Sequence, residues 1–225
     1  MAHISRIGWV PLKGMNWVSS PSAEVTAAGL AGDRCWAPVT PELMCLKATD
    51  HPTMVRLPLA PERLPTAADA LFDGREVDVT YYRHQIPARI HRGALAEELS
   101  AEAGRELWLA QTSARRFIYG SPVSVLLHSE LEGLPTDTDR YRPNIVIDDS
   151  DQALELRPGS RLQLGEVELD VAEELERCII INHHAGTGEA DHSLLKKIRP
   201  GALLAYGCKV RTPGPVHVGD TARLL

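Results

Sequence analysis

The sequence predicts a mainly β protein, a β-barrel with a few short helices, from three observations. Short runs of β-branched and other apolar residues recur along the whole chain of 225 residues. Segments rich in Gly and Pro separate these runs, as turns separate strands. Few stretches have helical periodicity, and the clearest is 93–107. This pattern favours a barrel over alternating strand–helix units.

The first half of the chain contains mostly short strand-like runs. These runs predict strands at 4–11, 22–26, 35–39, 43–48, 54–59, 76–82 and 108–111. Thr40-Pro41-Glu42 is expected to close a hairpin between the third and fourth of them. In 93–107, Leu95 and Leu99 fall on one stripe, which predicts an amphipathic helix.

The second half is richer still in strand-like runs. They predict strands at 145–147, 162–164, 167–171, 178–181, 203–211 and 216–218, and a closing strand at the end of the chain. Short helices are expected at 129–134 and 192–198. With 225 residues the chain is long enough for a sizeable core, in one large domain or two small ones.

The composition excludes several classes of protein. A hydrophobic content of 44% and a charged content of 24% are ordinary for a globular protein, and a net charge of −6 argues against a nucleic-acid binder. We expect no membrane span, because no apolar stretch approaches about 18 residues. Four widely spaced cysteines without a Cys-x-x-Cys motif, and a start without a long apolar segment, lead us to expect a cytoplasmic protein with free thiols.

Cys178 is the residue around which we expect the function to be organised. It follows Arg177 and precedes the apolar run 179–181, and the segment 182–188 is a polar loop with two His and two Gly. We therefore expect Cys178 where a buried strand emerges. A neighbouring guanidinium stabilises a thiolate, which is both a nucleophile and a metal ligand. A buried structural cysteine is the alternative, because free Cys is among the most buried residue types.

Several short motifs in a fixed order carry a family resemblance. In the second half they are RPNIVI at 142–147, GEVEL at 165–169, RC at 177–178, TG at 187–188 and PGPVHVGD at 213–220. In the first half they are PLKG at 11–14, GLAGDRCW at 29–36 and HP at 51–52. Together they resemble the MOSC family, which includes the C-terminal domain of molybdenum cofactor sulfurases.

The overall pattern is most similar to the mitochondrial amidoxime-reducing component and its bacterial counterparts. The resemblance implies a MOSC N-terminal β-barrel-like domain at 1–110 and a MOSC domain, also a β-barrel, at 111–225. It also implies a molybdenum cofactor (Mo-molybdopterin) between the two, with the Cys178 thiolate as the protein's metal ligand. A soft thiolate suits a metal that already carries the dithiolene sulfurs of the pterin.

The resemblance also implies which residues bind the cofactor. The matching positions are Lys13, Arg34, Ser121, Arg142, Asn144 and Arg177. Arg offers a planar fork for a phosphate or a pterin edge, and Lys offers a point charge. A turn-forming role for Asn144 and a capping role for Ser121 remain alternatives.

The chain departs from the family pattern at three places. Gly14 replaces a usual Ser, and an aromatic expected at Gly207 is shifted to Tyr206. The loop after the cysteine, usually acidic, contains His183 and His184, and His184 takes the place of a common Asp. Because His can donate a proton near neutral pH, both histidines are candidate catalytic proton donors. The alternative is that both are exposed loop residues.

The resemblance implies a molybdenum-dependent reductase of N-oxygenated small molecules, either N-hydroxyl compounds or N-oxides. Its electrons would come from a separate donor protein of the ferredoxin or cytochrome type. A sulfur carrier or sulfurtransferase with a Cys178 persulfide is the first alternative. The second is a non-catalytic descendant that binds a small molecule or a partner in the old cofactor cleft.

Overall fold

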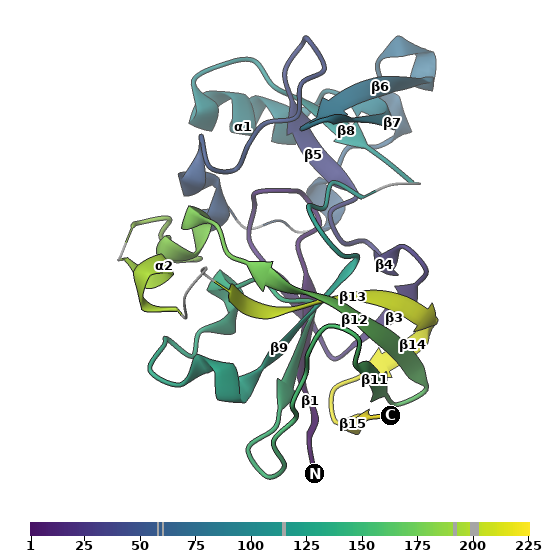
Figure 1. Cartoon of the computed structure of the whole chain (residues 1–225). Coiled ribbons are helices and arrows are strands. Elements are labelled where there is room, and N and C mark those ends of the chain that lie inside the picture. The colour runs from purple at the N-terminus through teal and green to yellow at the C-terminus, as the bar shows by residue number, and fades with distance from the viewer. Residues whose placement is uncertain (58, 60, 114–115, 191–192, 199–202) are drawn as a thin grey trace.

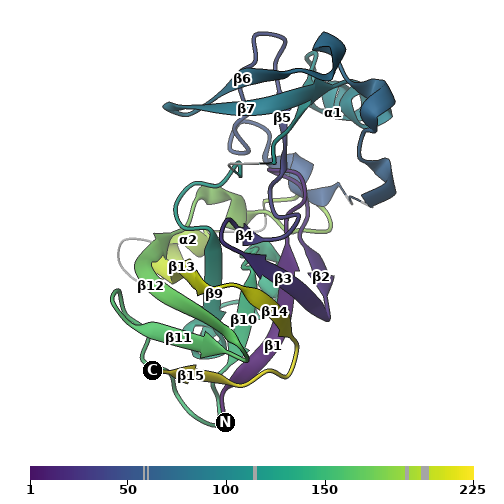
Figure 2. The ribbon, with the colours of Figure 1, turned by 90° about the vertical axis from the view of Figure 1, so that its right-hand side faces the viewer.

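The computed structural model describes residues 1–57, 59, 61–113, 116–190, 193–198 and 203–225. Within these residues the strands form sheets of eight, four and three strands, so the predicted mainly β fold is confirmed. Figures 1 and 2 show two layers stacked along the long direction of the molecule. The eight-stranded sheet forms one layer, and the four-stranded sheet with helix α1 forms the other.

The eight-stranded sheet has the order β15-β11-β12-β13-β9-β10-β1-β2. Its strands are β1 (His3–Trp9), β2 (Val18–Ser20), β9 (Val123–Leu127), β10 (Ile145–Asp148), β11 (Arg161–Leu164), β12 (Val167–Glu176), β13 (Leu203–Thr212) and β15 (Ala222–Leu224). Neighbouring strands are antiparallel except β9 and β10. The sheet curls into a barrel, because a bridge between His3 and Thr221 brings the start of β1 beside β15. Both termini lie at that end (Figure 2).

The barrel interior is apolar because alternate residues of its strands point inward. Ile4, Ile7, Val125, Ile147 and Leu169 are fully buried in one cluster that draws on most of the large sheet. The same cluster contains Val25 and Val216, from a three-stranded sheet of β14 (Gly214–His217), β3 (Ser22–Thr26) and β4 (Gly29–Leu30). The end of the chain therefore packs with its beginning.

The second layer is a four-stranded antiparallel sheet. It consists of β5 (Trp36–Val39), β8 (Trp108–Gln111), β7 (His84–His91) and β6 (Glu76–Tyr81), in that order. The predicted helix in 93–107 is present as α1 (Ala94–Ala103), which buries Leu95 and Leu99 and ends at Gly104 in the left-handed conformation (φ 66°). The apolar face of α1 packs in one cluster with Leu109 of β8.

The pairing of strands bears on the expected division into 1–110 and 111–225. β1 and β2 belong to the eight-stranded sheet, and β3 and β4 pair with β14. The segment up to Leu30 therefore folds with the barrel, while β5 to β8 and α1 form the other layer. The division at residue 110 stays a prediction about domains, and the sheets themselves do not separate there.

Short helical turns connect the strands. They are η1 (Pro52–Arg56), η2 (Pro61–Arg63), η3 (Ala67–Asp69), η4 (Phe72–Gly74), η5 (His128–Leu131), η6 (Thr138–Arg140), η7 (Ile179–Asn182) and the α-helical turn α2 (Leu194–Lys197). η5 and α2 lie where short helices were expected, although residue 192 is outside the described residues. No helix in the described ranges is long and apolar enough to cross a membrane.

Three predicted strands are wrong. The run at 43–48 is reduced to isolated bridges at Met44 and Cys45, of which Cys45 pairs antiparallel with Val39 across the expected hairpin turn. The run at 54–59 begins inside η1, which Pro52 starts because a proline at the first helical position loses no hydrogen bond. The run at 178–181 falls on η7, since β12 ends at Glu176. Ile181 is buried there against the cluster of Leu126 and Tyr141, so packing rather than a strand ladder explains its β-branched side chain.

We predict that His91 makes the fold less stable as the pH falls. Its side chain is 3% exposed, and its Nδ1 lies 3.2 Å from the carbonyl oxygen of Thr66. Burial lowers the pKa of His91 below its usual 6.5, despite the nearby Asp69 carboxylate. The unfolded chain therefore takes up a proton that the folded chain does not. The free energy of unfolding should fall below pH 6.5, by at most about 1.4 kcal/mol per pH unit.

Urea unfolding at about pH 7.5 and about pH 5.5 measures this difference. A His91→Gln variant, which cannot titrate, should show a smaller loss of stability between the two pH values than the wild-type chain. Equal losses in the two proteins would contradict the assignment to His91.

Candidate functional site

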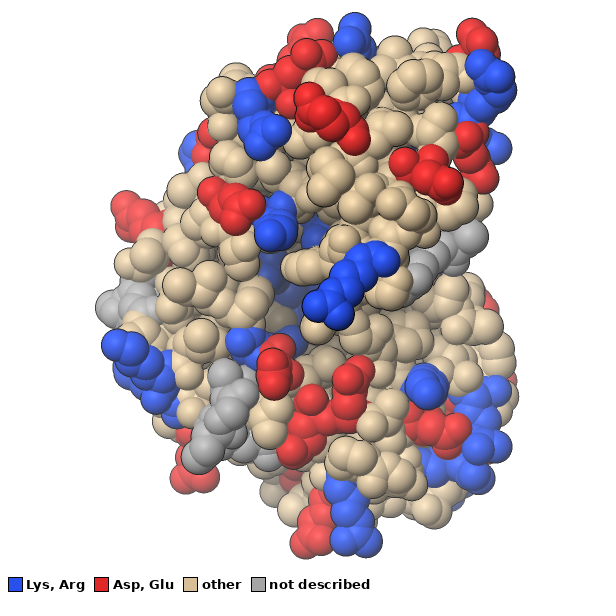
Figure 3. Space-filling view, turned by 45° about the horizontal axis from the view of Figure 1, so that its top comes forward, with Lys and Arg blue, Asp and Glu red and all other residues tan. Residues whose placement is uncertain are grey.

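A cavity of about 240 Å³ opens between the barrel and the second layer. Its lining contains every residue that the sequence predicted to bind the cofactor, together with the predicted metal ligand, namely Lys13, Arg34, Ser121, Arg142, Asn144, Arg177 and Cys178. Figure 3 shows Lys and Arg side chains inside this hollow, with acidic side chains on the surface below it. Segments that are far apart in the sequence thus meet at one place.

Cys178 is placed by the end of the long strand β12. The strand stops at Glu176, and Cys178 precedes η7 with an extended backbone (φ −98°, ψ 168°). Its side chain is exposed, so the alternative of a buried structural cysteine is wrong. Burial raises the pKa of Cys45 to about 11 and that of Cys208 to about 12, which keeps both as neutral thiols. Cys178 is therefore the accessible thiol of the four cysteines, all of which lie in the described residues.

Four cationic side chains surround the cavity: Lys13, Arg34, Arg142 and Arg177. Burial, reinforced by the neighbouring positive charges of Arg34 and Arg142, lowers the pKa of Lys13 to about 8. Burial likewise lowers the pKa of Arg142 and of Arg177 to about 10 each. A Cys178 thiolate opposes all three shifts, because it attracts the cations. Like charges held together in this way favour the binding of an anion.

Two of these cations have side-chain hydrogen-bond donors without an acceptor among the described residues. The Arg177 guanidinium donates one bond, of 3.0 Å, to the carbonyl oxygen of Tyr141, and its buried Nε has no partner. The Arg142 guanidinium makes no hydrogen bond or ion pair with any described residue. A buried donor without a partner is unfavourable, and an anionic ligand would satisfy it.

Two of the cations also have an unusual backbone. Arg34 (φ 44°) and Arg142 (φ 50°) both lie in the left-handed region, which long side chains rarely adopt. Hydrogen bonds hold them there, from Arg34 N–H to the carbonyl of Val10 (2.7 Å) and from Arg142 N–H to the carbonyl of Thr138 (3.2 Å). Backbone strain of this kind collects at functional sites, where the surrounding structure maintains it.

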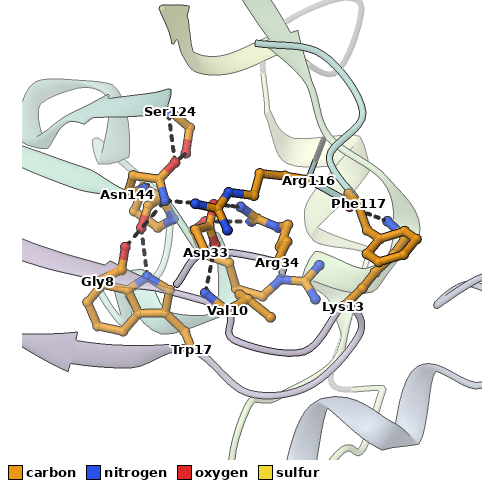
Figure 4. A network of polar contacts seen from close by, with 12 residues as sticks. Gly8, Val10, Lys13, Trp17, Asp33, Arg34, Arg116, Phe117, Ser124 and Asn144 are labelled. Atoms are coloured by element: carbon orange, nitrogen blue, oxygen red, sulfur yellow. Dashed lines mark hydrogen bonds and ion pairs between the residues drawn. The ribbon is translucent and has the colours of Figure 1, made fainter. Parts of the chain in front are cut away.

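Asp33 organises the wall of the cavity (Figure 4). Its carboxylate is fully buried, and its Oδ1 accepts a hydrogen bond of 3.0 Å from the N–H of Val10. Its Oδ2 accepts from Arg34 (2.6 Å) and from the Asn144 amide (3.1 Å). Asp33 lies in a turn within the motif GLAGDRCW at 29–36, but the sequence alone assigned it no role. Its position beside Arg34 in that turn is the signal that could have identified it.

The structure gives Asn144 a clear structural role. Its Oδ1 accepts hydrogen bonds from the N–H (2.9 Å) and hydroxyl (3.0 Å) of Ser124, and its Nδ2 donates to Asp33 and to the carbonyl of Gly8 (3.4 Å). Asn144 therefore joins β1, β9 and the Asp33 turn. Cofactor binding by Asn144 stays a prediction.

Ser121 is likewise held by the protein. Its N–H and its hydroxyl both donate to Glu173 Oε1, at 2.9 and 2.6 Å. Gly207 permits this contact, because a Cβ there would come within 2.9 Å of the Ser121 Cβ. This geometry explains why residue 207 is not aromatic, while Tyr206 is buried in the barrel core. Cofactor binding by Ser121 stays a prediction.

Gly14 suits its own backbone. It has a φ of 91°, a conformation that favours glycine over the Ser usual in the family. Its lack of a side chain leaves Lys13 as the donor that this turn contributes to the cavity lining.

His183 and His184 lie in the loop after η7 and are not brought into the cavity lining. His183 Nδ1 lies 3.0 Å from the carbonyl of Gly188. His184 Nδ1 accepts from the N–H groups of Gly186 (3.1 Å) and Thr187 (3.3 Å), as an Asp carboxylate does in an Asx turn. This explains how a His can replace the Asp common at this position. The catalytic role of both histidines stays a prediction.

Within the described ranges, no three or more His, Cys, Asp or Glu side chains gather into a group that could hold a metal ion. No curated protein matches the chain. The YUAD protein from Bacillus subtilis has a similar solved structure, with 14% identity, a TM-score of 0.49, and coverage of 99% of this chain and 94% of that one. The family model of the MOSC domain matches residues 118–223. Residues 118–223 of the chain are therefore identified as a MOSC domain.

Proposed function

We propose that the protein binds a molybdenum–pterin cofactor in the cavity and reduces N-oxygenated small molecules there. One observation carries the proposal: the exposed thiol Cys178 shares a cavity with four cations from separate segments of the chain. MOSC domains are associated in general with the molybdenum cofactor. The chemistry of the lining agrees with such a ligand, which combines a metal bound by sulfur ligands with an anionic phosphate.

The residues fit the two ends of this cofactor. Cys178 would supply one thiolate to the metal, by the preference of soft ligands for such metals. The unused donors of Arg142 and Arg177 would bind the phosphate or the pterin edge, and Lys13 would add a positive charge. Arg34 is fixed by Asp33, so its guanidinium is already oriented before a ligand arrives. When bound, the cofactor would supply two-electron oxygen-atom transfer.

The chain's own residues would prepare the site for this chemistry. The end of β12 fixes the position of Cys178, and Lys13, Arg34, Arg142 and Arg177 line the same cavity as its sulfur. Lys13 Nζ, held by the Tyr81 hydroxyl at 3.0 Å, has a pKa of about 8 and so holds a proton near neutral pH. A separate electron-donor protein of the ferredoxin or cytochrome type would supply the electrons.

Sulfur transfer is a second candidate function, because Cys178 alone among the four cysteines is exposed. An accessible thiolate beside cations is equally suited to carry a sulfur atom as a persulfide. Intact mass spectrometry separates the two candidates. A metal-free chain that carries one extra sulfur on Cys178, removable by mild reduction, would favour sulfur transfer.

We predict that Cys178 is required for metal binding and for reduction. Protein from a host that makes the cofactor should contain about one molybdenum and one pterin per chain, since a single cavity holds the predicted ligands. A Cys178→Ala variant should lose more than about a hundredfold in the reduction of an N-hydroxylated substrate by an artificial electron donor. A Cys45→Ala variant is the matched control. Full metal and full rate in Cys178→Ala would refute the role of Cys178.

We predict that an Arg142→Gly variant loads less cofactor without losing stability. The substitution removes a desolvated cation and places glycine at a positive φ that glycine prefers. Its melting temperature should therefore equal or exceed that of the wild-type chain, while its pterin content should fall about tenfold. Full pterin content in this variant would show that Arg142 does not hold the cofactor.

We predict that the cofactor-free cavity binds anions more weakly as Lys13 loses its proton. Sulfate is a suitable probe because its charge is constant between about pH 7 and about pH 9. Since the pKa of Lys13 is about 8, sulfate affinity should fall about tenfold over this range. Calorimetry should show that Lys13→Gln removes this dependence, whereas Lys209→Gln, an exposed control, keeps it. The same pH dependence in Lys13→Gln would assign it to another group.

A further inference from the structure

Two exposed tyrosines stand at the mouth of the cavity. Tyr82 is 52% exposed and Tyr119 is 81% exposed, and both belong to the lining that contains Cys178. Their ring centroids lie 5.5 Å apart, with the planes inclined at 52°. They come from different parts of the chain, since Tyr82 follows β6 and Tyr119 lies between β8 and β9. Paired aromatic rings that are exposed at a cavity are typical of a ligand-binding surface.

The backbone of Tyr82 is unusual for such a large residue. Tyr82 and Arg83 form the two-residue turn between β6 and β7, since Tyr81 pairs with His84. Tyr82 has a φ of 52°, at a position where tight hairpins normally use Gly or Asn. A bulky residue in this conformation is a genuine outlier. The Tyr82 ring therefore does not stabilise the turn. This points to a role for the ring at the cavity.

Buried aromatic rings support Tyr82 from below. Phe117 is fully buried and meets Tyr81 edge-on at 5.9 Å, and Tyr81, 2% exposed, meets Tyr82 edge-on at 4.8 Å. The series Phe117, Tyr81, Tyr82 and Tyr119 thus leads from the core to the surface. Because each inner ring is fixed by packing, Tyr82 is held in place before a ligand arrives.

Tyr119 is held in place by the residues before and after it in the sequence and not by contacts that fix its ring. The Phe117 N–H donates to the carbonyl of Arg34 (3.0 Å) on one side, and Ser121 is bound to Glu173 on the other. The segment is therefore anchored at both ends, while the ring between them stays exposed. A ligand that contacts both rings would bury surface that is now in water.

The charges of the cavity decide what kind of ligand fits. The lining holds four cations, and Glu176 is its acidic member among the described residues. A cationic group would be attracted by the ring faces but repelled by those of the four cations that the bound cofactor does not neutralise. Burial and the nearby Cys178 thiolate raise the pKa of Tyr82, so its hydroxyl stays neutral. Neutral or anionic planar groups are therefore favoured.

We propose that Tyr82 and Tyr119 bind a planar conjugated group of the substrate, neutral or anionic, and so make the site selective for aryl over alkyl N-oxygenated compounds. The inference rests on the proposed reductase function for the reacting end of the substrate. The rings would hold the unreactive end at the mouth while the N-oxygenated end reaches the cavity beside Cys178. Each ring contact of this kind strengthens binding about two- to tenfold beyond the effect of the buried area.

Equilibrium binding tests the proposal on protein isolated with its cofactor. The probes are benzohydroxamic acid, acetohydroxamic acid, and an aminomethyl derivative of the first that carries a positive charge. The wild-type protein should bind the neutral aryl probe more tightly than either of the others. Tyr82→Gly and Tyr119→Ala should each weaken binding of the aryl probe about two- to tenfold and leave the alkyl probe unchanged. The variants should also raise KM for the aryl compound with little change in kcat.

Folding defects are controlled in two ways. Tyr82→Gly places the preferred residue in the turn, so its melting temperature should not fall. Phe72→Gly is the matched control, because Phe72 is also exposed (42%), aromatic and at positive φ (54°), but lies outside the cavity lining. It should bind all three probes as the wild-type protein does.

Different results would overturn the two proposals. An unchanged preference for the aryl probe in Tyr82→Gly and Tyr119→Ala, an equal loss of both neutral probes, or no binding by the wild-type protein would overturn the tyrosine proposal. Selective binding of the aryl probe that depends on the tyrosines, without reduction of any hydroxamic acid by the metal-loaded protein, would support the tyrosine proposal and overturn the reductase function.

Discussion

The buried carboxylate of Asp33 is the interaction on which the site depends. A buried charge is unfavourable unless it is paired and hydrogen-bonded, and here three donors meet it, from Val10, Arg34 and Asn144. Through Asn144 the same network reaches Ser124 in β9 and the carbonyl of Gly8 in β1. One carboxylate thus ties the barrel strands to the turn that carries Arg34. Its loss would remove the ion pair of Arg34 and the acceptor of the Val10 N–H at the cavity wall.

The cavity concentrates positive charge that the protein itself does not neutralise. Arg34 is paired with Asp33, whereas the Arg142 guanidinium and the Nε of Arg177 have no partner among the described residues. Burial lowers the pKa of Lys13, Arg142 and Arg177, so the free site is electrostatically unfavourable. A bound anion would relieve this repulsion. The unfavourable electrostatics of the empty cavity therefore increase its affinity for an anion. The barrel provides the rigid frame that makes such an arrangement possible.

The sequence predicted the barrel and the members of the cavity, because strand runs and ordered motifs are local signals. It did not predict the turn η7, since an apolar β-branched run looks the same whether it pairs in a sheet or packs as Ile181 does. Tyr82 and Tyr119 also escaped prediction. A hairpin turn with Tyr in place of Gly carries no sequence signal, and exposure is a property of the folded chain alone. Asp33 was visible in its turn, but its partners lie far away in the sequence.

Anomalous diffraction at the molybdenum edge, from crystals of protein made in a cofactor-producing host, would locate the metal relative to Cys178. We expect one peak at bonding distance from Cys178 Sγ, with the cofactor's anionic end against Arg142 and Arg177. A peak bonded elsewhere, or a pterin that leaves Cys178 unligated and these guanidinium groups without a partner, would show that this cavity does not hold the cofactor as proposed.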